Sequence, residues 1–130
     1  MTTLFDNVTA FQNEIEQICA ACGRNSADVR IVPATKTVAV DVLNELPACG
    51  ITEIGENRVQ ELLQKYDAVH GVKWHVIGQL QSNKVKYIID KVSMIESVDR
   101  VSLADEIERL AAKANLVMPV LIEVNVARHP

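Results

Sequence analysis

The chain has 130 residues, of which 48% are hydrophobic and 23% are charged, and its formal net charge at pH 7 is −4. One ordinary domain spanning residues 1–130 is expected, because this length and apolar share suffice for one buried core. No basic stripe stands out, which argues against a nucleic-acid surface. No signal peptide is apparent, and no apolar run approaches the ~20 residues that span a bilayer, so we expect no membrane insertion and a cytoplasmic location.

Cysteine spacing does not predict a metal site. Cys19 and Cys22 form a C-x-x-C pair, but the pair lies inside a helical pattern and the third cysteine, Cys49, stands alone. A structural zinc site needs four ligands. We therefore expect the cysteines to pack as small apolar side chains.

Helical and strand-like patterns alternate along the chain. Apolar residues at steps of three and four predict a helix from Phe5 to Cys22, with Asp6 at its start and Gly23 at its end. Short apolar runs then recur about every twenty residues, each followed by a helical pattern. The predicted strands are 29–34, 51–54, 73–77, 92–97 and 117–126. The predicted helices cover 40–46 and the segments that follow the expected caps Asn57, Ser82 and Asp99.

This alternation predicts an α/β fold with a parallel sheet and right-handed crossovers. Two architectures fit it: an open doubly wound sheet, or a (β/α)₈ barrel cut short, since a barrel needs eight strands and typically ~250 residues. The sequence stops directly after the fifth predicted strand, so that strand lacks a covering helix. Two prolines are unusual: Pro33 lies within a strand although proline donates no ladder hydrogen bond, and Pro47 should end or kink the preceding helix.

Polar residues gather where the predicted strands end, which is where parallel α/β folds place their sites. Lys36 follows the first strand; it either extends harmlessly into solvent or serves as a Schiff-base lysine whose amine must lose a proton before it attacks an aldehyde. Asn57 is either a helix cap or an amide for a ligand oxygen. His75 within the third strand is either satisfied by a carbonyl or functional. The turn 81–84 is either solvated or an anion site, and Asn125 either ties strand ends together or faces a ligand.

Four motifs in this order and spacing resemble those of the pyridoxal phosphate homeostasis proteins, single-domain relatives of the alanine racemase barrel. The motifs are Ala34-Thr35-Lys36-Thr37, Gly55-Glu56-Asn57-Arg58-Val59-Gln60-Glu61, the segment from Trp74 to Lys84, and Ser97-Val98-Asp99. The resemblance extends from Val29 to Asn125. Pro33 and Pro47 depart from the family pattern, as does the terminal Arg128-His129-Pro130.

The resemblance implies a (β/α)₈ TIM barrel of the alanine racemase N-terminal type that holds pyridoxal 5′-phosphate (PLP) as a Schiff base on Lys36. Asn57 matches the residue expected near the pyridine ring, while His75, Asn83 and Asn125 match positions at neighbouring strand ends. The family binds PLP and balances the vitamin B6 and amino-acid pools, without established turnover. It implies PLP-accepting apo-enzymes as partners. Its phosphate clamp comes from later strands, so we expect weak PLP binding here.

Two other functions remain open. A PLP-dependent racemase or decarboxylase of the same barrel class needs a second, β-rich domain and an acid/base residue on the far side of the cofactor, and neither is visible in the sequence. Alternatively, the chain is an inactive fragment. In either case the first and fifth strands are exposed edges, which predicts self-association through those edges.

Overall fold

Parallel strands form the centre of the molecule. The computed structural model describes residues 3–128, and its four strands form one sheet in the order β1-β2-β3-β4, with every neighbouring pair parallel. The strands are β1 (Glu53–Glu56), β2 (Lys73–Val76), β3 (Val92–Val98) and β4 (Val120–Ile122). One helical segment links each successive pair: α3 (Val59–Tyr66), the 3₁₀ helix η3 (Ser82–Tyr87) and α4 (Val101–Lys113). The predicted parallel α/β alternation is confirmed.

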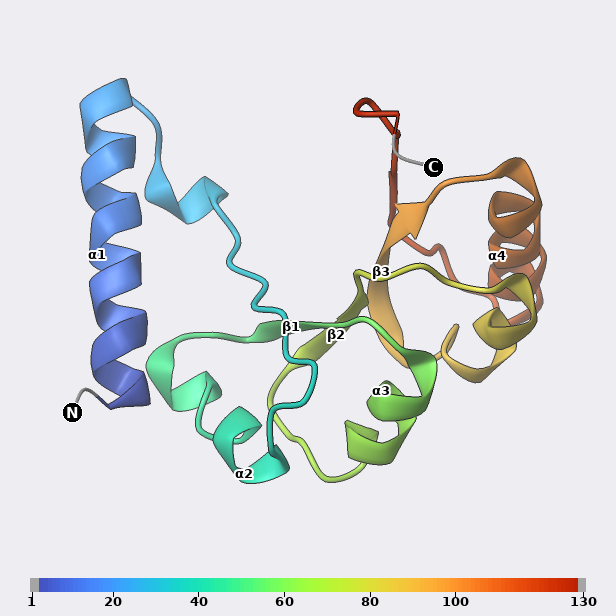
Figure 1. Ribbon diagram of the computed structural model, residues 1–130, viewed down its shortest axis with the longest axis horizontal. Coiled ribbons are helices and arrows are strands. Elements are labelled where there is room, and N and C mark those ends of the chain that lie inside the picture. The colour runs from blue at the N-terminus through green and yellow to red at the C-terminus, as the bar shows by residue number, and fades with distance from the viewer. Residues whose placement is uncertain (1–2, 129–130) are drawn as a thin grey trace.

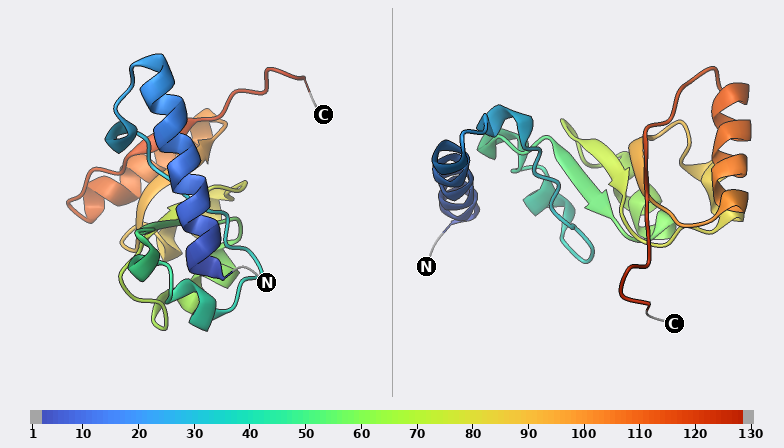
Figure 2. Two further views of the ribbon diagram at one scale, coloured as in Figure 1. Left: turned by 90° about the vertical axis from the view of Figure 1, so that its left-hand side faces the viewer. Right: turned by 90° about the horizontal axis from the view of Figure 1, so that it is seen from above.

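The strand order distinguishes the two predicted architectures. Strands that follow one another in sequence order, each joined by a helical link, are the arrangement of a (β/α)₈ barrel, whereas the strand order reverses in a doubly wound sheet. The observed order has no reversal. In Figures 1 and 2 the sheet lies between helix α1 (Leu4–Cys22) at one end of the molecule and α4 at the other. The sheet is therefore a partial barrel.

The predicted first strand, 29–34, forms only a single bridge, between Ala34 and Gly55. The Gly55 N–H donates to the Pro33 carbonyl and the Thr35 N–H donates to the Gly55 carbonyl, each at 2.9 Å. The next bridge of a parallel ladder would require an N–H at position 33, pointing at the Glu53 carbonyl. Because Pro33 has no N–H, the ladder stops there. The last predicted strand is also shorter than 117–126, since β4 covers only Val120–Ile122.

Several predicted helix ends differ in the structure. Thr3, not Asp6, caps α1, and Asp6 completes a capping box; Gly23 ends the helix with φ 74°, as predicted. Arg58 and Arg100, rather than Asn57 and Asp99, occupy the cap positions of α3 and α4, and neither forms a side-chain cap. Helix α2 (Val40–Leu43) ends before the predicted 46, and the short 3₁₀ helix η2 (Pro47–Cys49) follows. A third 3₁₀ helix, η1 (Ser26–Asp28), follows α1.

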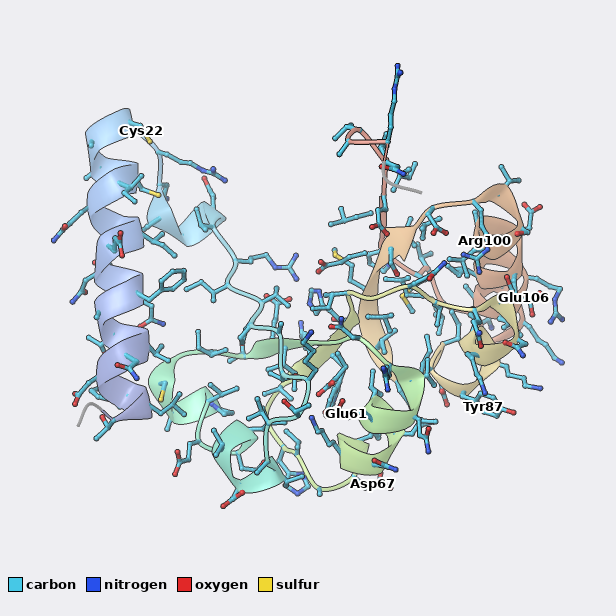
Figure 3. All side chains as sticks on the ribbon, in the orientation of Figure 1. Cys22, Glu61, Asp67, Tyr87, Arg100 and Glu106 are labelled. Atoms are coloured by element: carbon cyan, nitrogen blue, oxygen red, sulfur yellow. The ribbon has the colours of Figure 1, made fainter. Side chains whose placement is uncertain are left out.

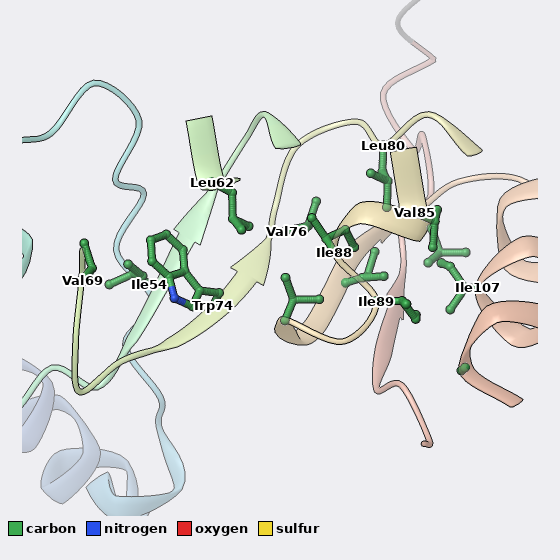
Figure 4. Packing of buried hydrophobic residues seen from close by; sticks show 14 of the residues in the cluster. Ile54, Leu62, Val69, Trp74, Val76, Leu80, Val85, Ile88, Ile89 and Ile107 are labelled. Atoms are coloured by element: carbon green, nitrogen blue, oxygen red, sulfur yellow. The ribbon is translucent and has the colours of Figure 1, made fainter. Parts of the chain in front are cut away.

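The hydrophobic core lies between the sheet and the helices that follow its strands. Ile54, Trp74 and Val76 lie in this core from β1 and β2, and Leu62 and Ile107 join it from α3 and α4 (Figure 4). Since successive side chains of a strand alternate between faces, Glu53, Gly55 and His75 lie on the opposite face. Thus the helix-covered face of the sheet carries most of the apolar core, and the opposite face carries Glu53 and His75.

Two further sequence expectations concern cysteines and membranes. All three cysteines are free: Cys19 is buried and Cys49 is half-buried, but Cys22 is exposed, so the packing prediction is wrong for Cys22. Among the helices of residues 3–128, none is both long and apolar enough to cross a bilayer.

Candidate functional site at the carboxyl edge of the sheet

Lys36 and Asn57 lie at the same edge of the sheet. Ala34 and Gly55 are bridged in parallel, and Lys36 and Asn57 each follow their bridged residue by two positions. The Lys36 side chain is exposed. Both residues therefore follow the bridged pair at the carboxyl edge of the sheet, Lys36 in a turn and Asn57 at the end of β1.

The turn that carries Lys36 is attached to β1 and α3. The Thr35 hydroxyl lies 2.9 Å from Glu56 Oε1 and 3.2 Å from the Gly55 carbonyl oxygen, and its single proton is shared between them. Lys65 Nζ donates to the Thr35 carbonyl at 2.9 Å. On the other side of Lys36, the Thr37 N–H donates to Glu61 Oε2 at 2.6 Å. Figure 3 shows Glu61 on the side of α3 that faces this turn.

The attachments meet in one ionic cluster formed by Glu56, Glu61 and Lys65, the α3 cluster. Lys65 Nζ lies 2.7 Å from Glu56 Oε1 and 2.6 Å from Glu61 Oε2. Burial lowers the pKa of Lys65, but its hydrogen bonds to Glu56 and Glu61 outweigh that effect and raise this pKa above its usual value. The hydrogen bond from Lys65, with that from the Thr37 N–H, lowers the pKa of Glu61. Lys65 and Glu61 are therefore charged at neutral pH.

The Asn57 side chain is not used as a helix cap. Arg58 holds the cap position of α3, and Asn57 Oδ1 is buried without a hydrogen-bond partner in residues 3–128. Buried amide oxygens normally have a partner, so this oxygen is an unused hydrogen-bond acceptor. A Cβ atom at Gly78 would lie 2.7 Å from the Asn57 backbone oxygen. Glycine at position 78 is thus what allows the β2 end to approach Asn57 so closely.

A groove of about 680 Å³ opens beside Asn57, between the start of α3 and the loop before η3. Its polar lining includes Asn57, Arg58, Gln79, Gln81 and Lys84. Lys36 is not among its lining residues. Asn83, in the first turn of η3, is exposed. The backbone of the preceding loop is held by Arg100, whose guanidinium donates to the Leu80 carbonyl at 2.7 Å.

His75 lies deeper, at the level of Gly55, and is 1% exposed. Its Nδ1 is 2.6 Å from Glu96 Oε1 and its Nε2 is 3.0 Å from Glu53 Oε1. Arg30 donates to Glu53 from both Nε and a terminal nitrogen. We call Arg30, Glu53, His75 and Glu96 the inner network.

Both ring nitrogens of His75 are therefore engaged by protein carboxylates. The hydrogen bond from Arg30, assisted by that from His75 and opposed by burial, lowers the pKa of Glu53 from 4.5 to about 2. This geometry favours a structural role for His75 over direct contact with a ligand.

Asn125 lies beyond β4 at an exposed position. Its carbonyl oxygen is 3.4 Å from the Arg128 nitrogen. None of the contacts described above joins Asn125 to the Lys36 turn, so the role of Asn125 stays a prediction. The same holds for the role of Asn83.

A family model described as "Alanine racemase, N-terminal domain" matches residues 7–129. The chain belongs to this family. Among curated relatives in it, the pyridoxal phosphate homeostasis protein of Aquifex aeolicus is 49% identical over 114 residues, which are 86% of this chain and 50% of the relative. That of Synechocystis is 34% identical over 99 residues, 74% of this chain and 45% of the relative. The resemblance drawn from the motifs is thereby confirmed, and the chain spans about half the length of the curated relatives it matches.

Solved structures agree with the placement in the alanine racemase N-terminal domain family. A protein from Bifidobacterium adolescentis, titled as unknown, matches with a TM-score of 0.78 and 32% identity, over 90% of this chain and 53% of its own. PipY of Synechococcus elongatus, solved with PLP bound, matches with a TM-score of 0.72 and 27% identity, over 86% of this chain and 54% of its own. The partial-barrel fold is therefore shared with these proteins.

The α3 cluster and the inner network are not among the sequence-based predictions. Glu61 and Lys65 are spaced i, i+4 on a helix, a readable signal for an ion pair. No comparable local signal links Glu53 to His75 and Glu96, since these residues come together only through the register of three strands.

Proposed function

We propose that this chain binds PLP at the carboxyl edge of its sheet, held as a Schiff base on Lys36, and that it serves PLP homeostasis. The observation that carries the proposal is that Lys36 and Asn57 both follow the bridged pair Ala34–Gly55 by two positions, at the carboxyl edge of the sheet. One residue offers a primary amine and the other an unpaired amide oxygen. The relatives named as PLP homeostasis proteins and the PLP-bound PipY support it.

The residues at this edge fit the cofactor. When bound, PLP supplies an aldehyde whose condensation with a lysine amine forms a C=N bond and releases one water. Lys36 is exposed and can reach a small molecule. Asn57 lines the neighbouring groove, and its unused acceptor would orient a polar ring substituent once the side chain turns toward that groove. The phosphate grip is expected to lie outside these strands, so we expect weak binding by residues 1–130.

Reductive trapping tests the proposal. The chain is incubated with PLP, reduced with borohydride and digested, and the adducts are mapped by mass spectrometry. We expect one dominant adduct on Lys36, which Lys36→Ala abolishes. Lys113→Ala is the control, because Lys113 is an exposed lysine at the end of α4, outside the groove beside Asn57, and it should leave the Lys36 adduct intact. Labelling that is scattered over several lysines and unchanged in Lys36→Ala would contradict the proposal.

We also propose that the chain does not turn over amino acids. The relatives carry the name homeostasis protein, and both nitrogens of His75 are already held by carboxylates, which leaves this histidine poorly placed to move a substrate proton. Racemisation of L-alanine in the presence of PLP, followed by chiral chromatography, should not exceed that of free PLP. Activity above that background which Lys36→Ala removes would favour the racemase alternative.

Location and partners are proposals of the same kind. We propose a cytoplasmic location and transfer of PLP to apo-enzymes; of these, only the link to PLP is supported by the names of the relatives. Self-association is supported by the exposed apolar side chains in and after β4, among them Ile122 and Val126. Light scattering after size exclusion should show dimers or larger species, and a monomer at all concentrations would contradict self-association.

A further inference from the structure

The turn 35–37 needs support from outside the sheet. Thr37 has φ 64°, a left-handed conformation that β-branched residues rarely adopt. The sheet itself holds this segment by one bridge and two backbone hydrogen bonds, because Pro33 prevents a longer ladder. A turn with a strained residue and so short a ladder would not present its lysine in one direction unless other contacts fixed it.

The α3 cluster provides such contacts on both sides of Lys36. Before the lysine, the Thr35 carbonyl accepts from Lys65 Nζ and the Thr35 hydroxyl lies against Glu56. After it, the Thr37 N–H donates to Glu61. The Lys65 ammonium contacts both carboxylates and so joins the two attachment points. Lys36 itself remains exposed between them.

We propose that Glu56, Glu61 and Lys65 are positioning residues that fix the Lys36 turn against α3 and so present the Lys36 amine at the carboxyl edge of the sheet. This inference rests on the proposed function, because it concerns the same lysine. Two features support it. Thr35 is 2% exposed and Glu56 1% exposed, so this side of the attachment is shielded from water. The cluster holds a cation between two anions, so its hydrogen bonds are of the stronger, charge-assisted kind.

The inference predicts a change at one backbone amide. In Glu61→Ala the Thr37 N–H loses its acceptor, and its hydrogen exchange, measured by NMR, should become about tenfold faster or more. Glu61→Gln keeps an oxygen acceptor but not the charge, so its exchange rate should lie between those of the Ala variant and the wild type. Glu108→Ala, on the exposed side of α4, is the matched control and should leave Thr37 unchanged.

The same variants are then trapped with PLP and borohydride. We expect the share of adduct on Lys36 to fall several-fold in Glu61→Ala, less in Glu61→Gln, and not at all in Glu108→Ala. Circular dichroism and protected core amides report whether each variant is folded. If Glu61→Ala does not fold, the Gln variant decides the question.

The outcomes separate this inference from the proposed function. If hydrogen exchange at the Thr37 amide is unchanged in Glu61→Ala, the positioning role is overturned, regardless of where PLP labels the chain. Wild-type labelling concentrated on Lys36 and equally concentrated in Glu61→Ala would also overturn it, while the proposed function stands. Wild-type labelling without preference for Lys36 would contradict the proposed function, and faster Thr37 exchange would then still show that Glu61 holds the turn.

Discussion

Two ionic groups hold the sheet from opposite faces, and they differ in what they attach. The α3 cluster lies on the helix-covered face and ties the Lys36 turn to β1 and α3. The inner network, Arg30 with Glu53, His75 and Glu96, lies on the other face and links the segment before the Lys36 turn to three strands. Charged residues close to a candidate site can therefore hold either the site or the scaffold, depending on the face of the sheet on which they lie.

The largest effect is expected from Lys65→Met. It removes the only cation that the α3 cluster contains and leaves the buried Glu56 carboxylate without its partner. Breaking one side of a buried ion pair costs about 3–5 kcal/mol, so the free energy of unfolding measured in urea should fall by that amount. Lys91→Met is the control, because the Lys91–Asp90 pair is a surface pair, expected to contribute below about 1 kcal/mol. Equal losses of unfolding free energy in Lys65→Met and Lys91→Met would mean that the α3 cluster contributes no more than a surface ion pair.

A smaller loss is expected from His75→Leu, which removes the shared partner of Glu53 and Glu96. Unsatisfied buried groups cost about 1–3 kcal/mol, so unfolding in urea should show a decrease of that size. The Lys36 share of PLP adducts should not change, because this network does not contact the Lys36 turn through the bonds described above. Loss of Lys36 labelling in a folded His75→Leu protein would show that both ionic groups serve the site.

The inner network also predicts that the free energy of unfolding falls in acid. The folded-state pKa of Glu53 is about 2, below its usual 4.5, so between these values the unfolded chain binds more protons than the folded one. The stabilisation by Glu53 is therefore complete above about pH 5 and is lost as the pH falls toward 2. Unfolding free energies measured from pH 6 to pH 2 should fall less steeply in Glu53→Gln than in the wild type. Equal slopes of unfolding free energy against pH in the two proteins would contradict the lowered pKa of Glu53.

The smallest effect on stability is expected from Glu61→Ala. The Glu61–Lys65 pair is an i, i+4 pair at the edge of the cluster, and such pairs stabilise a helix by about 0.3–0.5 kcal/mol. The urea midpoint should thus barely move while the Thr37 amide exchanges much faster. A stability loss as large as that of Lys65→Met would mean that Glu61 supports the core rather than the turn.

Local patterns were sufficient to predict the features of the chain that depend on neighbouring residues. The alternation of apolar runs predicted the parallel sheet, and the position of Lys36 after an apolar run predicted its place at the carboxyl edge. Gly23 at the end of α1 followed from the conformational freedom of glycine. These features depend on segments of a few residues, which is why the sequence alone reveals them.

Features that depend on distant residues were not predicted. Pro33 is unusual within a strand, but the sequence alone does not show that its missing N–H faces the Glu53 carbonyl, which is why the predicted strand is reduced to one bridge. Asn57 matched a capping pattern, yet the helix begins one residue later and leaves the amide oxygen unpaired. The inner network joins residues more than twenty positions apart, so strand register has to be known before it can be seen.

The most direct measurement is the distribution of borohydride-trapped PLP over the lysines of the wild type, His75→Leu and Glu61→Ala, compared side by side by peptide mapping. We expect Lys36 to carry most of the adduct in the wild type and in His75→Leu, and to lose its preference in Glu61→Ala. An even distribution over the exposed lysines of the wild type would contradict the proposal that this sheet edge presents Lys36 to the cofactor.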